Sequence, residues 1–227
     1  NELNNNGLLN VKAIELDVTK PDTILSAKNI IEKEQGCLDI LINNAGISGI
    51  VPQNALETGI DKFKEVFEVN LYGVISITQT FIGLLQKSSE PRIVNVSTSV
   101  GSLSLQSNPN WQAYDYAKYA VYASSKSALN MFTIHLAYEL RDTAFKINAV
   151  CPGFIGTRWF KDRMDEEQYE RMEQGVRKSV PLHVASGPDD IADSAIFFLT
   201  DSSRHVTGET LLVDAGMHLG YAPLSAR

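Results

Sequence analysis

The sequence predicts an α/β domain built on a doubly wound parallel sheet. Short runs rich in β-branched residues alternate with longer segments of helical period along the whole chain. The short runs are apolar almost throughout, which is typical of parallel strands covered on both faces. The 227 residues contain no internal repeat and no low-complexity linker, so we expect one domain over residues 1–227.

The strands and helices follow from this pattern in chain order. Pro21 and Pro188 suit the first position of a helix, and Asp189 and Asp190 suit the positive end of a helix dipole. Residues 102–110 and 158–182 are expected to be irregular. The expected strands are residues 13–18, 38–43, 92–97, 146–151 and 210–214, and the expected helices are residues 21–35, 60–86, 119–141 and 188–200.

Composition excludes several classes of protein. A formal net charge of −7 without a basic block argues against a nucleic-acid-binding protein, whose Lys and Arg cluster against phosphates. A hydrophobic content of 44% argues against disorder. The longest uncharged stretches are interrupted by polar residues, so we expect no membrane span, and no signal peptide is visible. Cys37 and Cys151 are too few for a disulfide framework or a metal site, which favours a reducing, cytoplasmic location.

Small and polar residues follow three of the expected strands. They are Asn-Asn-Ala-Gly at residues 43–46, Ser-Thr-Ser-Val-Gly at 97–101 and Pro-Gly-Phe-Ile-Gly-Thr at 152–157. Ligands of open parallel sheets bind at the carboxyl ends of the strands, where such residues let a flat ligand approach the backbone. Each segment alone also fits an ordinary βα turn. Three at one sheet edge favour a binding site.

The order of these motifs is similar to that of the short-chain dehydrogenase/reductase family, from about residue 10 to residue 216. The further motifs that carry the resemblance are Leu-Asp-Val-Thr at 16–19, Val-Asn-Leu at 69–71, Tyr-Ala-Ser-Ser-Lys at 122–126, and Thr-Gly-Glu with Val-Asp-Ala-Gly between 207 and 216. The resemblance implies a Rossmann-like fold and an enzyme that interconverts a small-molecule carbonyl and a secondary alcohol by hydride transfer with NAD or NADP.

A Tyr and a Lys four residues apart occur twice, as Tyr114 with Lys118 and as Tyr122 with Lys126. We choose Tyr122 as the catalytic tyrosine because it opens a long helical pattern and precedes residues 152–157 at the family's usual interval. An unperturbed tyrosine has a pKa of about 10. A lysine ammonium one helical turn away is expected to lower that pKa, so that Tyr122 acts as general acid and base.

The resemblance implies two further catalytic roles. Asn70 matches the asparagine that connects the lysine to solvent through an ordered water. Thr98, or Ser99 as the second choice, matches the serine whose hydroxyl polarises the substrate oxygen. Tyr122 follows Thr98 by 24 positions, whereas most members of the family have about a dozen. We therefore expect an inserted flap over residues 102–120 beside the substrate pocket.

The resemblance also implies the cofactor-binding residues. An acidic residue at a strand end often only caps the next turn, so that alternative stays open for Asp17. Asp17 and Val18 are assigned to the adenine, Asn43, Ala45 and Gly46 to the adenosine and its ribose, Tyr122 and Lys126 to the nicotinamide ribose, and Pro152, Gly153, Ile155 and Thr157 to the nicotinamide amide.

The glycine-rich turn that receives a dinucleotide pyrophosphate is not found. Neither G-x-G-x-x-G nor the family's looser form can be written with these glycines. By alignment the chain starts before the third strand, so we expect that a first βαβ unit of about 30 residues is missing and is supplied elsewhere. The residue that distinguishes NAD from NADP lies in the same unit, so the preference is not readable.

Substrate and assembly are less constrained. The long insert resembles carbonyl reductases, and residues 207–216 resemble 3-oxoacyl-acyl-carrier-protein reductases, where this segment sits at a subunit contact. A homo-oligomer, a dimer or tetramer, is therefore expected. The segment after the third strand-end motif carries several large apolar and aromatic side chains, which suggest an apolar lid over residues 158–182. Simple helix packing explains them equally well. They are Phe154, Trp159, Phe160, Met164 and Tyr169.

Two other functions remain open. A catalytically inactive dinucleotide-binding or scaffold protein of the same fold would fit the absent phosphate loop and the threonine at the serine position. A sugar epimerase or dehydratase of the related extended fold is less favoured, because little chain follows Gly216.

Overall fold

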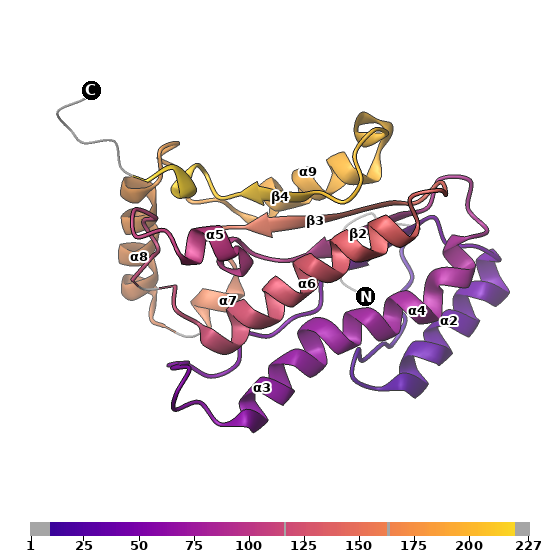
Figure 1. Cartoon of the computed structure of the whole chain (residues 1–227), viewed down its shortest axis with the longest axis horizontal. Helices are drawn as coiled ribbons and strands as arrows, with labels where there is room; N and C mark the ends of the chain where they lie inside the picture. Colours follow the sequence, from indigo (N-terminus) through magenta and orange to yellow (C-terminus); the bar gives the residue numbers. More distant parts are fainter. Residues whose placement is uncertain (1–9, 116, 163, 221–227) are drawn as a thin grey trace.

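The computed structural model describes residues 10–115, 117–162 and 164–220 (Figure 1). Its centre is a four-stranded sheet in which all neighbouring strands are parallel. The strands stand in chain order as β1 (Ile40–Asn43), β2 (Arg92–Val96), β3 (Lys146–Pro152) and β4 (Thr210–Val213). The predicted doubly wound parallel sheet is confirmed.

Helices cover both faces of this sheet. On one face lie α2 (Pro21–Gln35), α3 (Ile60–Phe67), α4 (Val74–Leu85) and α6 (Ala120–Glu139), and α9 (Pro188–Leu199) lies on the other (Figure 1). Two short helices, α5 (Leu103–Gln106) and α7 (Arg158–Lys161), and the longer α8 (Glu166–Ser179) gather at the end toward which the β3 and β4 arrows point. Three 3-10 turns complete the chain: η2 (Ser99–Gly101), η3 (Asp201–Ser203) and η4 (Met217–Leu219).

The core has one layer on each side of the sheet. Ile93 and Ile147 pack with Leu85 of α4 and Ala137 of α6. On the opposite face, Val94 and Val150 pack with Phe198 of α9. Because neighbouring residues of a strand point to opposite faces, both of them covered, β2 and β3 are mostly apolar, and this is why the sequence predicted both strands well.

The predicted strand at residues 13–18 is wrong, since this segment has no strand structure. The side chains of Ile14 and Val18 pack against the α2–α4 cluster, but their backbone has no neighbouring strand to pair with. A β-branched pattern cannot form a ladder without such a partner. The segment ends instead in a turn that leads into α2.

The helix predicted over residues 60–86 is interrupted. Between α3 and α4 the chain forms a π-helical turn, η1 (Glu68–Gly73). Residues 158–182 were predicted to be irregular, and this is also wrong, because they contain α7 and α8. Helix α8 starts at a capping box in which Asp165 and Gln168 each accept from the other's backbone N–H.

The outer edge of β1 carries exposed apolar side chains. Ile40 and Ile42 are 38% and 46% exposed. Among the described residues β1 pairs only with β2, so its other edge offers free backbone groups. The additional βαβ unit expected from the sequence would pair here, and it stays a prediction. No helix in the described part of the chain is both long and apolar enough to cross a membrane.

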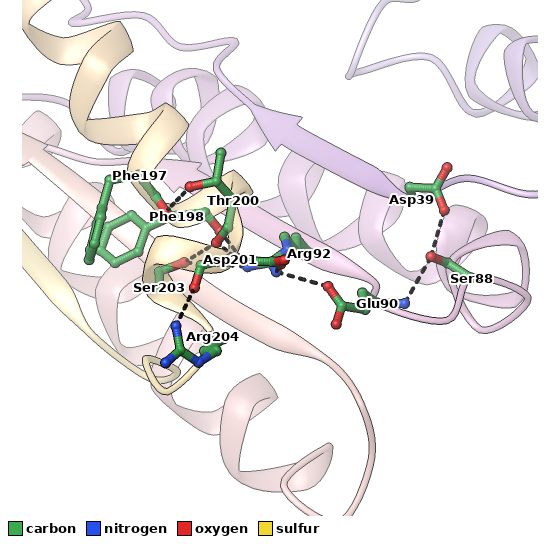
Figure 2. A network of polar contacts seen from close by, with 10 residues as sticks. All are labelled: Asp39, Ser88, Glu90, Arg92, Phe197, Phe198, Thr200, Asp201, Ser203 and Arg204. Carbon is green, nitrogen blue, oxygen red and sulfur yellow. Dashed lines mark hydrogen bonds and ion pairs between the residues drawn. The ribbon is translucent and has the colours of Figure 1, made fainter.

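At the amino ends of the strands, Arg92 joins β2 to the end of α9. Its side chain is 3% exposed, whereas the carboxylates of Glu90 and Asp201 are 55% and 81% exposed. Figure 2 shows the guanidinium pointing into the turn that follows α9. It donates to the backbone oxygens of Phe198 and Thr200, to the hydroxyl of Ser203, and to the carboxylates of Glu90 and Asp201.

We expect Arg92→Met to lower the free energy of unfolding by about 3 kcal/mol, because buried backbone oxygens lose their donor. Glu90→Gln is the control and should cost below about 1 kcal/mol, because its ion pair is half exposed. Urea unfolding of the two variants measures both values. A loss for Arg92→Met no larger than that of the control would contradict this account.

Candidate active site

Thr98 and Tyr122 meet at the carboxyl ends of the strands. Thr98 follows β2, and Tyr122 lies in the first turn of α6. The Thr98 hydroxyl lies beside the Tyr122 phenol and donates to the Pro152 backbone oxygen at the end of β3, 3.2 Å away. Two strands and one helix therefore fix these two hydroxyl groups beside each other.

Ser99 has a different environment. It begins the 3-10 turn η2 and is buried. The hydroxyl that contacts Tyr122 is that of Thr98, which also caps η2 by accepting from the Val100 N–H. The structure thus places Thr98, which the sequence analysis preferred over Ser99, next to Tyr122.

Burial raises the pKa of Tyr122 to about 12, and the Thr98 hydrogen bond opposes part of this rise. We expected Lys126 to lower the pKa of Tyr122, and for this structure that expectation is wrong. The phenol stays neutral at physiological pH. It is therefore a proton donor as it stands, whereas its use as a base requires a ligand or substrate that stabilises the phenolate.

Lys126 is buried one helical turn after Tyr122. Its Nζ donates to the backbone oxygen of Val96, the last residue of β2, 2.7 Å away. Burial lowers the pKa of Lys126 to about 8, because the charged form is poorly solvated. An ammonium has three N–H donors, of which Val96 takes one.

Asn70 lies in the π-helical turn η1 and is fully buried. Its Oδ1 accepts from the Ile47 N–H at 2.8 Å, and its Nδ2 donates to the Ile47 oxygen at 2.9 Å and to Ser125 Oγ at 3.0 Å. Ser125 Oγ in turn donates to the Tyr122 backbone oxygen. Asn70 therefore ties the loop after β1 to the helix of Tyr122, and π turns of this kind are frequent at functional sites.

Gly46 lets the backbone lie close to both Asn70 and Lys126. A Cβ on Gly46 would lie 3.3 Å from Asn70 Oδ1 and 3.5 Å from Lys126 Nζ. Any side chain at this position would fill the region next to the ammonium. Without a side chain at Gly46, the N–H donors of Lys126 stay uncovered on this side, and such donors fit the hydroxyl groups of a nicotinamide ribose.

A cavity of about 360 Å³ lies between β1 and helices α2 and α4. Three residues that were predicted to bind the adenosine side of the cofactor line it, namely Val18, Asn43 at the end of β1 and Ala45 in the loop after it. The buried Asn43 side chain donates to Asn95 Oδ1 at 2.8 Å, so it also holds β1 to β2. The other lining side chains are mostly apolar, which suits a flat aromatic group.

The Asp17 side chain stabilises the turn in which Asp17 lies. Its Oδ1 accepts from the Thr19 N–H at 3.0 Å and from the Thr19 hydroxyl at 2.7 Å, and Lys20 Nζ lies 2.9 Å from Oδ2. The hydrogen bond from Lys20 lowers the pKa of Asp17 to about 2. The capping alternative therefore describes its contacts in this structure, and adenine binding by Asp17 stays a prediction.

Residues 152–157 form the loop after β3. The Gly153 N–H donates to the Val213 oxygen, and a Cβ on Gly153 would lie 2.7 Å from that of Asp214, so the loop lies directly against the end of β4. Ile155 bridges to Ser186, and Thr157 caps α7 through its hydroxyl. These contacts hold the predicted nicotinamide loop over the carboxyl end of the sheet.

The Tyr114 and Lys118 pair lies in residues 102–120, the segment predicted to be an inserted flap. Lys118 Nζ stands 3.7 Å from the centre of the Tyr114 ring and donates to the Gln106 oxygen. Gln106 Nε2 also donates to the oxygens of Val100 and Ala117, which closes the base of the flap. This pair packs the flap together, and Tyr122 is the tyrosine that faces Thr98.

Two side chains of the site were missed. Ser125 lies inside the Tyr-Ala-Ser-Ser-Lys motif, so the motif itself could have indicated it. Gln53 is buried and accepts from the Tyr122 N–H across 69 positions of sequence, and no local pattern indicates such a contact. No group of three or more His, Cys, Asp or Glu residues in the described part of the chain could hold a metal ion.

Comparison with known proteins identifies the family. The family model described as enoyl-(acyl carrier protein) reductase matches residues 4–218. The 3-oxoacyl-[acyl-carrier-protein] reductase FabG of Escherichia coli is 30% identical over 211 residues, which are 92% of this chain and 79% of that protein. The chain belongs to the short-chain dehydrogenase/reductase family. It is thus an NAD(P)-dependent oxidoreductase, and the predicted family and cofactor class are confirmed.

Solved structures of short-chain dehydrogenase/reductases have the same fold. One such protein from Caenorhabditis elegans, solved with cofactor, has a TM-score of 0.79 and 26% identity, covering 93% of this chain and 77% of that one. ElxO with NADP bound has a TM-score of 0.75 and 30% identity, covering 89% of this chain and 76% of its own.

Proposed function

We propose that this enzyme interconverts a carbonyl compound and a secondary alcohol by hydride transfer, with Tyr122 as general acid and base. The placement of the Thr98 hydroxyl beside the Tyr122 phenol, at the carboxyl ends of the strands, carries the proposal. Two adjacent hydroxyls, one held by β2 and one by α6, can hydrogen-bond the same substrate oxygen. Bound NADH or NADPH supplies the hydride.

In the direction of reduction, the neutral Tyr122 phenol donates its proton to the carbonyl oxygen. Its pKa of about 12 keeps the proton available at physiological pH. Thr98 polarises the same oxygen through its hydroxyl. Lys126 holds the hydroxyls of the nicotinamide ribose beside Gly46, and Asn70 supports the proton path along the loop after β1.

The remaining cofactor contacts are proposed from their positions. The cavity lined by Val18, Asn43 and Ala45 would take the adenosine, and residues 152–157 would take the nicotinamide amide. The choice between NAD and NADP is open, although the similar ElxO structure contains NADP. Both cofactors should be titrated by fluorescence.

Assembly and location are proposed from exposed features. Helix α6 presents Met131, Ile134 and Tyr138, which are 54%, 44% and 63% exposed at helical spacing, and this supports a homo-oligomer. Cys37 and Cys151 are free thiols, which supports a reducing, cytoplasmic location.

The proposed function is tested by following the oxidation of NADH and NADPH with a panel of ketones that includes a 3-oxoacyl thioester. We expect turnover with at least one carbonyl compound. The thioester is included because the FabG relatives are named for 3-oxoacyl reduction. Cofactor binding without turnover of any carbonyl would favour the inactive scaffold instead.

We expect Thr98→Val to lower kcat about 10²-fold, because the substrate oxygen loses one of its two hydrogen-bond partners. Ser99→Ala should keep kcat near the wild-type value, since Thr98 is the residue that contacts Tyr122. Steady-state kinetics of both variants with one carbonyl substrate measures the difference. If Ser99→Ala shows the larger loss, the two roles must be exchanged.

A further inference from the structure

The first turn of α6 has N–H groups that need partners outside the helix. The residue before the helix, Tyr119, provides no side-chain cap, and Tyr122 is the third helical residue. One residue from a distant loop satisfies two of these groups. The Ala120 N–H donates to the Gln53 backbone oxygen at 3.2 Å, and the Tyr122 N–H donates to Gln53 Oε1 at 2.9 Å.

Gln53 is itself held firmly. Its side chain is buried, with 3% of the residue exposed, and its Nε2 donates to the Ser48 oxygen at 2.5 Å. A Cβ on Gly49 would come within 3.3 Å of that Nε2, so the loop packs closely around the amide. The acceptor that faces the Tyr122 N–H therefore has a fixed position.

The loop that carries Gln53 is anchored to a second residue of the site. Near its start, Ile47 exchanges two hydrogen bonds with the Asn70 side chain, at 2.8 and 2.9 Å. One short segment after β1 is thus fixed to Asn70 at one end and to the Tyr122 backbone at the other. Both contacts meet at the carboxyl end of the sheet.

We propose that Gln53 is a positioning residue that sets the place of Tyr122 through the backbone of α6. This inference rests on the proposed function of Tyr122. Proton transfer needs the phenol within hydrogen-bond reach of the substrate oxygen, and a shift of about 1 Å costs about 10²-fold in rate. The Gln53 amide does not reach the substrate; it fixes the turn from which the phenol extends.

The test compares two substitutions of Gln53 in the full chain. Gln53→Met keeps the length of the side chain but removes the acceptor, so kcat should fall about 10-fold to 10²-fold with the dissociation constant of the cofactor nearly unchanged. In Gln53→Glu, burial favours the protonated carboxyl, which keeps an acceptor oxygen for the Tyr122 N–H and an O–H donor for the Ser48 backbone oxygen. The kcat of this variant should stay within about 3-fold of the wild type.

Asn148 offers a matched control. Like Gln53, it is buried and its amide bridges two backbone groups, since Nδ2 donates to the Val206 oxygen at 3.2 Å and Oδ1 accepts from the Glu209 N–H at 3.0 Å. Neither partner belongs to α6. Asn148→Leu should lower the thermal midpoint as Gln53→Met does, while its kcat stays at the wild-type value.

The outcomes separate the two proposals. Two results would show that Gln53 does not position Tyr122. In the first, the kcat of Gln53→Met is as high as that of Asn148→Leu. In the second, Gln53→Glu loses as much kcat as Gln53→Met. If Gln53→Met fails to fold, the kcat of Gln53→Glu decides by itself. Failure of the proposed function would show separately, as turnover that survives the loss of the Tyr122 hydroxyl.

Discussion

Tyr122→Phe should lower kcat by about 10²-fold to 10⁴-fold, because the reaction loses its general acid. The substitution removes one oxygen from a residue that also packs against Trp159, whose ring centre lies 6.1 Å from that of Tyr122. The ring and its packing are retained. Cofactor affinity should therefore stay nearly unchanged, and this separates loss of chemistry from loss of binding.

Steady-state kinetics and a fluorescence titration of the cofactor measure the two effects. Tyr114→Phe is the matched control, because Tyr114 belongs to the other Tyr–Lys pair and packs under Lys118 in the flap. It should keep a kcat near that of the wild type. Equal losses in the two variants would contradict the choice of Tyr122.

Lys126→Met should weaken cofactor binding about 10-fold to 10²-fold, because hydrogen bonds from a charged group to the ribose are lost. This differs from the Tyr122→Phe result, in which binding is kept. The Val96 oxygen also loses its donor, so a small loss of stability is expected. Isothermal titration with NADH and NADPH measures the dissociation constants.

The pH dependence gives a second test of Lys126. Its pKa is lowered to about 8 by burial, so the ammonium is present below that pH and is lost as the pH rises through it. For the wild type, kcat/KM for the cofactor should fall above about pH 8. Lys126→Met should lack this fall. The contrary result is that Lys126→Met binds the cofactor normally and changes only the pH at which the Tyr122 phenol titrates in the pH profile of kcat. In that case Lys126 acts on the phenol and not on the cofactor.

The sequence predicted best those elements whose limits depend on residues close together along the chain. Helix α2 matches its predicted range because Pro21 starts it and Gly36, with a φ of 76°, ends it. Strands β2 and β3 were found because burial on both faces makes them mostly apolar. Thr98, Tyr122 and Lys126 were found through motif order, and the parallel sheet brings them to one edge.

What the sequence did not predict depends on partners distant along the chain. Residues 13–18 have strand composition but no adjacent strand, and the π turn at Asn70 is stabilised by contacts with Ile47 and Ser125. Helix α8 is largely polar, so its apolar pattern is sparse. The role of Gln53 depends on a contact with a helix 69 positions away.

The most direct test of the central claim is a transfer of deuterium. The full-length enzyme is incubated with a carbonyl substrate and with NADH or NADPH in which both hydrogens on the hydride-donating carbon are deuterium, and the alcohol is analysed by mass spectrometry. The account predicts one deuterium on the carbinol carbon with the wild type and almost none with Tyr122→Phe. An alcohol without deuterium from the wild type, or an equal yield from both proteins, would contradict it.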